Sequence, residues 1–74
     1  MGIMHVLGSQ GDRETHWSPG DSQSVIDARK VFDRHVESGA LAFSARDPGE
    51  EVVQTKHFDP DSGEIIITHP LRGG

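Results

Sequence analysis

The sequence predicts one α+β domain, in which a single helix packs across one face of a mixed sheet of four to five strands. Three observations predict it. Short apolar or alternating segments, typical of strands, lie before and after one stretch with helical periodicity. Segments rich in glycine and proline separate them. The chain has 74 residues, enough for one small core. We therefore treat residues 1–74 as a single domain, with a globular body at about residues 3–69 and an exposed tail at 70–74.

Two strands are expected at the start of the chain. Residues 3–7 are apolar apart from His5, and a glycine-containing turn follows them. Residues 13–17 then alternate, with Trp17 on one face and His16 on the other. The loop between the two segments exceeds two residues, so the register stays open by one position, and a shift of one position would swap the faces.

Residues 24–38 form the one predicted helix. Asp21 or Ser22 can accept hydrogen bonds from its first free amides, and Gly39 is placed to end it in a left-handed conformation. At about 100° per residue, the apolar side chains fall in one arc about 140° wide, with charged side chains opposite. That arc comprises Val25, Ala28, Val31, Phe32 and Val36.

Three further strands are expected after the helix, over residues 40–45, 52–58 and around the three isoleucines at 65–67. Turn sequences rich in Asp, Pro and Gly separate them. The β-branched isoleucines favour a half-buried strand, and Pro70 removes a backbone donor and ends it.

The helix must cover one face of the sheet, because a chain this short has no other layer to bury its apolar stripe. We expect the first and last strands to lie side by side and parallel in the middle of the sheet, with a right-handed connection preferred. A plain meander with the helix laid across it is the alternative. The predicted core consists of Trp17, Phe32, Leu41, Phe43, Ile65 and Ile67.

Ile66 points away from the face that its two neighbours share. If the helix covers only the face of Ile65 and Ile67, Ile66 joins Val53 or Val6 in an exposed apolar patch. Such patches usually mark binding sites for partners. A single isoleucine at the surface needs no such explanation, so both interpretations stay open.

Composition argues against several classes of function. Twelve acidic residues against seven Lys and Arg give a net charge of −5, which argues against nonspecific nucleic-acid binding. The chain has no cysteine, which excludes a disulfide framework and thiolate metal sites. It also lacks a long apolar segment and a basic leader, so we expect neither a membrane span nor a signal peptide. We therefore expect a cytoplasmic location.

Patterns typical of catalysis and metal binding are weak. The serines near the helix start are explained by capping, and no nucleophile elbow or phosphate loop is present. We therefore expect no enzyme activity and no cofactor. The five histidines include no pair at the helical spacing of metal ligands, so no metal site is predicted. His5, His16 and His69 could nevertheless meet across adjacent strands, which would make stability pH-dependent.

The sequence Leu71-Arg72-Gly73-Gly74 is the strongest functional signal. Glycine has no Cβ, so an extended Gly-Gly segment can pass through a slot too narrow for other residues and bring its carboxylate to a buried reactive centre. Chance places two glycines at the end of roughly 0.5% of chains. An inert, frayed terminus is the alternative.

The element order, the length and these closing residues resemble ubiquitin and the ubiquitin-like β-grasp proteins, because the same Leu-Arg-Gly-Gly ends mature ubiquitin. The resemblance implies a protein modifier or carrier whose Gly74 carboxylate is adenylated by an activating enzyme. The acyl group then passes to a thioester, a conjugate or a thiocarboxylate, and conjugation or protease partners act downstream. Gly73 would be the slender neighbour, Arg72 would pair with acidic groups of the activating enzyme, and Leu71 would be an apolar anchor.

A looser resemblance is to short uncharacterised proteins of actinobacteria and their phages. These are similar in having a Phe-Asp-Pro turn, as at residues 58–60, then an aliphatic strand and a proline-containing end that finishes in Gly-Gly. This resemblance implies a non-enzymatic structural or accessory protein that binds phage or bacterial structural proteins through its sheet face or an edge strand, with an inert tail.

Overall fold

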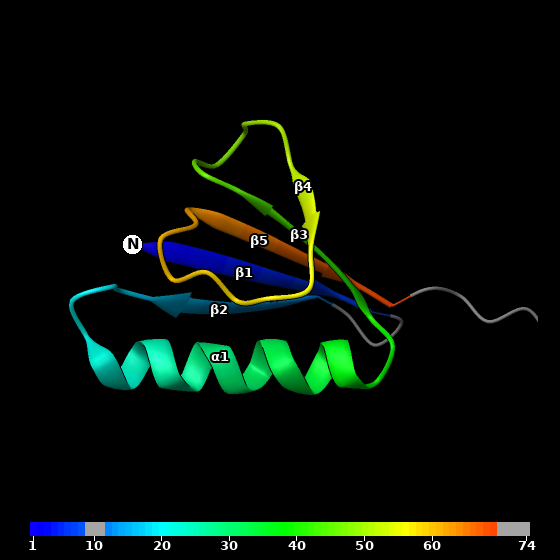
Figure 1. Ribbon diagram of the computed structural model, residues 1–74, viewed down its shortest axis with the longest axis horizontal. Coiled ribbons are helices and arrows are strands. Elements are labelled where there is room, and N and C mark those ends of the chain that lie inside the picture. Colours follow the sequence, from blue (N-terminus) through cyan, green and yellow to red (C-terminus); the bar gives the residue numbers. More distant parts are fainter. Residues whose placement is uncertain (9–11, 70–74) are drawn as a thin grey trace, which may run out of the picture.

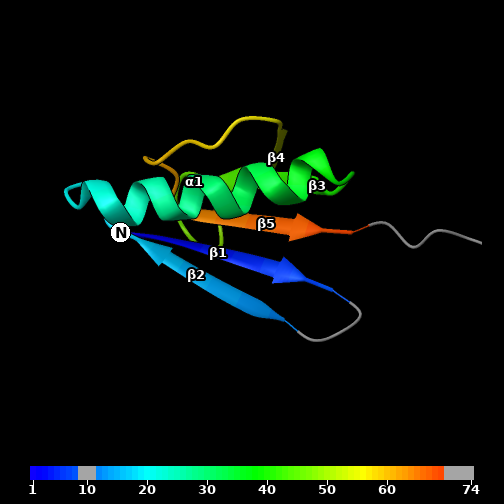
Figure 2. The same cartoon turned by 90° about the horizontal axis from the view of Figure 1, so that it is seen from below.

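The computed structural model describes residues 1–8 and 12–69. Its elements in chain order are β1 (Gly2–Leu7), β2 (Arg13–Trp17), α1 (Ser22–Glu37), β3 (Leu41–Ala45), β4 (Val53–Thr55) and β5 (Glu64–Thr68). One sheet contains all five strands in the order β2-β1-β5-β3-β4. The helix lies across one face of this sheet (Figures 1 and 2). The predicted α+β class is therefore confirmed, and the arrangement is β-grasp-like.

The first and last strands are parallel neighbours in the middle of the sheet. Met4 lies opposite Ile65, and Val6 lies opposite Ile67. β2 pairs with β1, and β3 pairs with β5, both antiparallel. Parallel strands need a long crossover connection, and here β2, α1, β3 and β4 lie between the two strands along the chain. The predicted central pair is confirmed, and the alternative of a plain meander is wrong.

The helix begins and ends at the predicted signals. The Asp21 carboxylate accepts hydrogen bonds from the backbone N–H groups of Gln23 and Ser24, at 3.1 and 3.4 Å. Gly39 follows the carboxyl end with a φ of 100°, a conformation that a side chain would disfavour. The predicted arc faces the sheet: two members are buried and three pack half-buried against the core. The buried pair is Ala28 and Phe32, and the others are Val25, Val31 and Val36.

Asp21→Ala should lower the free energy of unfolding by about 0.5–2 kcal/mol, because the first amides of α1 would lose their acceptor. Urea denaturation followed by circular dichroism measures the change. Ser22→Ala is the matched control, since Ser22 is an exposed residue in the first turn whose side chain is not the cap. Equal effects of the two substitutions would contradict the capping role of Asp21.

The core lies between α1 and the sheet, and three aromatic rings form its centre. Phe58, from the connection between β4 and β5, packs edge-on against Trp17 and Phe32, with ring centroids 5.0 and 5.9 Å away. The indole N–H of Trp17 donates to the backbone oxygen of Pro60 at 2.9 Å. The sequence placed Phe58 in the fourth strand, but β4 ends at Thr55 because the chain turns from the sheet to bury this ring.

Two predicted core residues lie on the other face of the sheet. β3 pairs Ala42 with Ile67 and Phe43 with Ile66, so Ala42 faces the helix, whereas Leu41 and Phe43 face away from it. Leu41 is 41% exposed. The core assignment of Leu41 and Phe43 is therefore wrong, while the other four predicted members are buried. The small side chain of Ala42 suits the helix side of β3, because the large rings of the core already fill that space.

Candidate functional site

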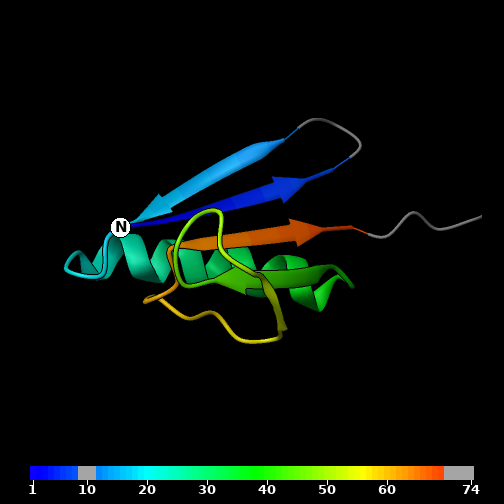
Figure 3. The same cartoon turned by 90° about the horizontal axis from the view of Figure 1, so that it is seen from above.

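The four residues of the predicted conjugation tail, Leu71, Arg72, Gly73 and Gly74, lie outside the described residues. The structure places the strand that precedes them. β5 is paired on both sides, with β1 and with β3, and it ends at Thr68. Figure 3 shows β1 and β5 running in the same direction, so both strands end at the same edge of the body.

An apolar surface covers part of the sheet opposite α1. Ile66 and Phe43 are neighbours in one row of this face, and Leu7, Thr68 and Leu41 form the next row, at the end of β5. Leu7 and Leu41 are 39% and 41% exposed, and Ile66 and Phe43 are half-buried. We call these four apolar residues the helix-free face. Exposed apolar side chains grouped in this way are typical of surfaces that bind partners.

Val6 and Val53 do not belong to the helix-free face. Val6 pairs with Ile67 and is buried in the core. Val53 is 65% exposed, but it pairs with Ser44 and so lies on the helix side of the sheet, beyond the part that α1 covers. Of the predicted patch, only Ile66 lies on the open face. Its neighbours on that face were missed because the alternation in residues 40–45 was assigned the opposite phase.

Two histidines and two glutamates lie beside the helix-free face, on β1, β2 and β5. His5 Nδ1 is 3.8 Å from Glu14 Oε1, and His5 Nε2 is 3.5 Å from Glu64 Oε2. His16 Nε2 is 3.4 Å from Glu14 Oε2. Within residues 1–8 and 12–69, no group of three His, Cys, Asp or Glu side chains is arranged to hold a metal ion. The cluster therefore gives this face a polar border of alternating imidazoles and carboxylates.

His69 lies apart from His5 and His16 and contacts His35 on the last turn of α1. His35 Nδ1 and His69 Nε2 are 2.8 Å apart, and the two rings meet edge to face. Burial lowers the pKa of His35, and the positive charges of His69, Arg34 and Arg13 lower it further. One ring must be neutral to accept the hydrogen bond, so the contact holds the end of β5 to the helix only while that ring stays unprotonated.

Stability should fall as the pH drops below about 6.5, the ordinary pKa of histidine. The pKa of His35 is lower in the folded chain, so the unfolded chain binds more protons in this range. The stability that His35 contributes is therefore fully present when the pH is above its pKa in the unfolded chain. This stability is lost as the pH falls through its lower pKa in the folded chain. Urea denaturation between about pH 7.5 and 5 measures it. His35→Gln should flatten the curve, and an unchanged curve would contradict the assignment.

The described residues thus offer two features for function: the helix-free face and the central strand that leads to the tail. Within the described ranges, the helix α1 is not long and apolar enough to cross a bilayer. Comparison of the chain with protein-family models, curated proteins and solved structures gives no match.

Proposed function

We propose that this chain is a ubiquitin-like protein modifier or carrier that acts through the carboxylate of Gly74. The observation that supports this best is the position of β5. It is the central strand of a β-grasp-like sheet and is hydrogen-bonded on both sides. Only His69 and Pro70 separate its end at Thr68 from the Leu-Arg-Gly-Gly sequence. A rigid body that leads directly into a segment with little side-chain bulk suits the delivery of a carboxylate to another protein.

The chemistry that we propose is acyl activation. An oxygen of the Gly74 carboxylate attacks the α-phosphorus of ATP in an activating enzyme, and pyrophosphate leaves. A cysteine thiolate of that enzyme, or a sulfur donor, then attacks the carbonyl carbon of Gly74 and displaces AMP. The product is a thioester or a thiocarboxylate, and an amine can attack the thioester to form a conjugate. In this scheme the chain is the carrier and supplies no catalytic side chain.

We assign recognition by the activating enzyme to the helix-free face. Leu7 and Leu41 are the most exposed members of this face, and both lie in the row at the end of β5. An enzyme that covers this row would be seated at the edge from which the chain continues toward Gly74. The apolar centre and the polar border of His5, Glu14, His16 and Glu64 match the usual layout of a protein interface.

The test is an ATP-dependent covalent adduct. The full chain is incubated with a lysate of the organism that encodes it, with and without ATP, and adducts are detected by intact-mass measurement. We expect an adduct only with ATP, and its loss when Gly73 and Gly74 are deleted. Gly20→Ala is the control for a glycine change elsewhere in the chain and should still form the adduct, because no atom lies within 4 Å of the added Cβ. The proposal fails if the full chain forms no adduct, or if the deletion variant forms the same one.

A second candidate is a non-enzymatic phage or bacterial structural protein with an inert tail, which is favoured by the exposed helix-free face and the exposed edge strand β4. In this case, binding to other structural proteins would depend on the face alone. Leu41→Ser should abolish binding in pull-down experiments, while deletion of Gly73 and Gly74 should leave it unchanged. Loss of binding on deletion of Gly73 and Gly74 would favour the modifier, for which Leu41→Ser should weaken recognition as well.

A further inference from the structure

The strand β2 lies at one border of the sheet and has a free outer edge. Its neighbour in the sheet is β1, and Figures 2 and 3 show no described segment along its other side. In the described part of the chain, no loop or turn forms a backbone hydrogen bond with Arg13–Trp17. A free edge presents a row of N–H and C=O groups with which another strand can pair.

The backbone groups that point outward from β2 belong to Glu14 and His16. The Ile3 N–H donates to the carbonyl of Gly63 at 3.1 Å, so the backbone groups of Ile3 point toward β5. Those of the next residue in β1 point toward β2, because the direction alternates along a strand, and this residue lies opposite Thr15. Thr15 therefore bonds to β1, whereas the N–H and C=O groups of Glu14 and His16 point away from β1.

The side chains of these two residues complement each other. Glu14 lies opposite His5, and His16 lies opposite Ile3, so both side chains are on the side of the sheet that faces away from α1. Both residues are exposed. A carboxylate accepts hydrogen bonds, and an imidazole has at least one N–H to donate. A strand that brought an imidazole beside Glu14 and a carboxylate beside His16 would give both side chains a partner.

A second copy of β2 is such a strand. If two copies pair antiparallel with Thr15 opposite Thr15 of the second copy, each Glu14 lies opposite His16 of the other copy. Each of these Glu–His pairs would exchange two backbone hydrogen bonds. The two threonines would meet on the α1 side of the sheet, and cross-strand threonine pairs are favourable.

The neighbouring twofold registers fit less well. A pair centred on Glu14 puts two carboxylates opposite each other, and like charges in this position are destabilising. A pair centred on His16 puts Glu14 opposite Ser18 of the second copy, whose N–H already donates to the Ser24 hydroxyl at 3.0 Å. Of these three registers, the one centred on Thr15 pairs the outward backbone groups and the complementary side chains together.

We propose that two copies of this chain associate through β2, in the register centred on Thr15, so that their two sheets become continuous. The same strand is used on both sides, so the contact is isologous and the association stops at two chains. Only the central residues of each strand make the contact, and an interface of this size is typical of weak, transient association. This inference is independent of any chemistry at Gly74.

The first test is the mass of the full chain as its concentration rises from micromolar to millimolar. Sedimentation equilibrium should show the mass increasing from that of one chain, 8.1 kDa, toward that of two. Amide chemical shifts of the ¹⁵N-labelled chain should move most in β2. A mass that stays at one chain or grows beyond two would overturn the inference. Shifts centred on β4 or on the helix-free face would overturn it as well, because another surface would then make the contact.

Two charge variants test the register. His16→Glu makes β2 acidic at both positions, and association should weaken about tenfold because two attractive pairs become repulsive. The double variant Glu14→Lys with His16→Lys makes both positions basic and should also lose association. An equimolar mixture of the two variants should restore the dimer, since each carboxylate then faces an ammonium group. A mixture that associates no better than either variant alone would overturn the inference.

His57→Glu is the matched control for the added charge. His57 is exposed and follows β4, at the opposite border of the sheet, so this substitution should leave association unchanged. An equal loss in this control would show general repulsion between acidic chains and would overturn the inference. Deletion of Gly73 and Gly74 should also leave association unchanged, which keeps this test separate from that of the proposed function. Loss of association in the deletion variant would overturn the inference too.

Discussion

Replacing Phe32 with alanine should lower the free energy of unfolding by about 3–5 kcal/mol. Phe32 is fully buried on the core side of α1, and its ring packs against Phe58. The substitution would leave a cavity at the centre of the core, where the helix, the sheet and the connection between β4 and β5 meet. At roughly 0.05–0.15 kcal/mol per residue, a domain of this length has about 4–11 kcal/mol in total. The loss is therefore a large part of the total stability, and the variant should unfold at a much lower urea concentration than the unmodified chain.

Urea denaturation followed by circular dichroism and by Trp17 fluorescence measures this loss. Lys30→Ala is the matched control on the exposed side of the same helix, and it should change stability by less than about 0.5 kcal/mol. A Phe32→Ala variant as stable as the control would show that α1 does not pack on the sheet through this face.

Gly63→Ala is the second substitution with a large expected effect. A Cβ at this position would lie 2.4 Å from the backbone oxygen of Arg46 and 3.0 Å from the Cα of Asp47. Both atoms belong to the backbone, so no side chain can rotate away, and one of the hydrogen bonds of Gly63 must lengthen or break. We expect a loss of about 1–3 kcal/mol, the usual cost of forcing extra volume into a packed site.

The matched control is Gly20→Ala. No heavy atom lies within 4 Å of the added Cβ there, and the residue has no positive φ. This substitution should leave stability unchanged or raise it by up to about 1 kcal/mol, because alanine restricts the unfolded chain. Equal denaturation midpoints for the two variants would contradict the close approach of Gly63 to the end of β3.

The helix could be predicted from sequence because its signals are local. Asp21 caps one end, Gly39 follows the other, and every member of the predicted apolar arc packs toward the core. The central pair of strands was also predictable, because a single helix must cross the sheet to bury its stripe. The burial of Ile65 and Ile67 was predictable as well. Alternate residues of a strand share one face, and in the central strand this face lies under the helix.

The facing of β3 could not be predicted from its own residues. An alternating strand has two equivalent phases, and its partner decides between them. Leu41 and Phe43 favoured the core by hydrophobicity, but the pairing of Phe43 with Ile66 puts both on the helix-free face. The facing of Val6 in β1 was ambiguous in the same way. Val6 was predicted on the exposed face, but its pairing with the buried Ile67 places it in the core.

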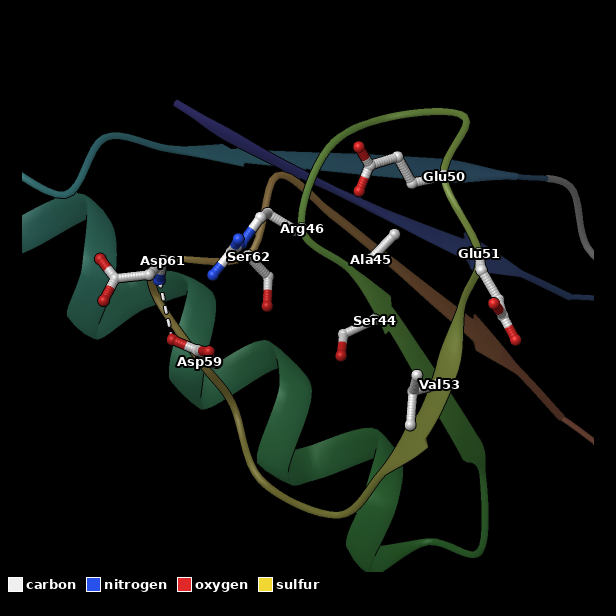
Figure 4. A pocket seen from close by; sticks show the side chains of 9 residues that line it. All are labelled: Ser44, Ala45, Arg46, Glu50, Glu51, Val53, Asp59, Asp61 and Ser62. Atoms are coloured by element: carbon white, nitrogen blue, oxygen red, sulfur yellow. Dashed lines mark hydrogen bonds between the residues drawn. The ribbon is translucent and has the colours of Figure 1, made fainter.

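Contacts between distant segments also could not be predicted from the sequence. His35 and His69 meet across 34 positions of the chain, and no local pattern links the end of the helix with the end of β5. The carboxylates of Glu50, Glu51, Asp59 and Asp61 likewise come together from two loops that the sequence identifies only as turns (Figure 4). In both cases the residue types were visible, whereas their juxtaposition depends on how the strands pair.

The most direct test of the proposed function is the position of the new bond in an ATP-dependent adduct. Tandem mass spectrometry of the purified adduct locates the bond, and hydroxylamine separates a thioester from a stable amide. We predict a bond at the carbonyl carbon of Gly74, with a fraction of the adduct released by hydroxylamine. A bond at Lys30 or Lys56, or no ATP-dependent adduct from a chain that still binds a partner through Leu41, would contradict it.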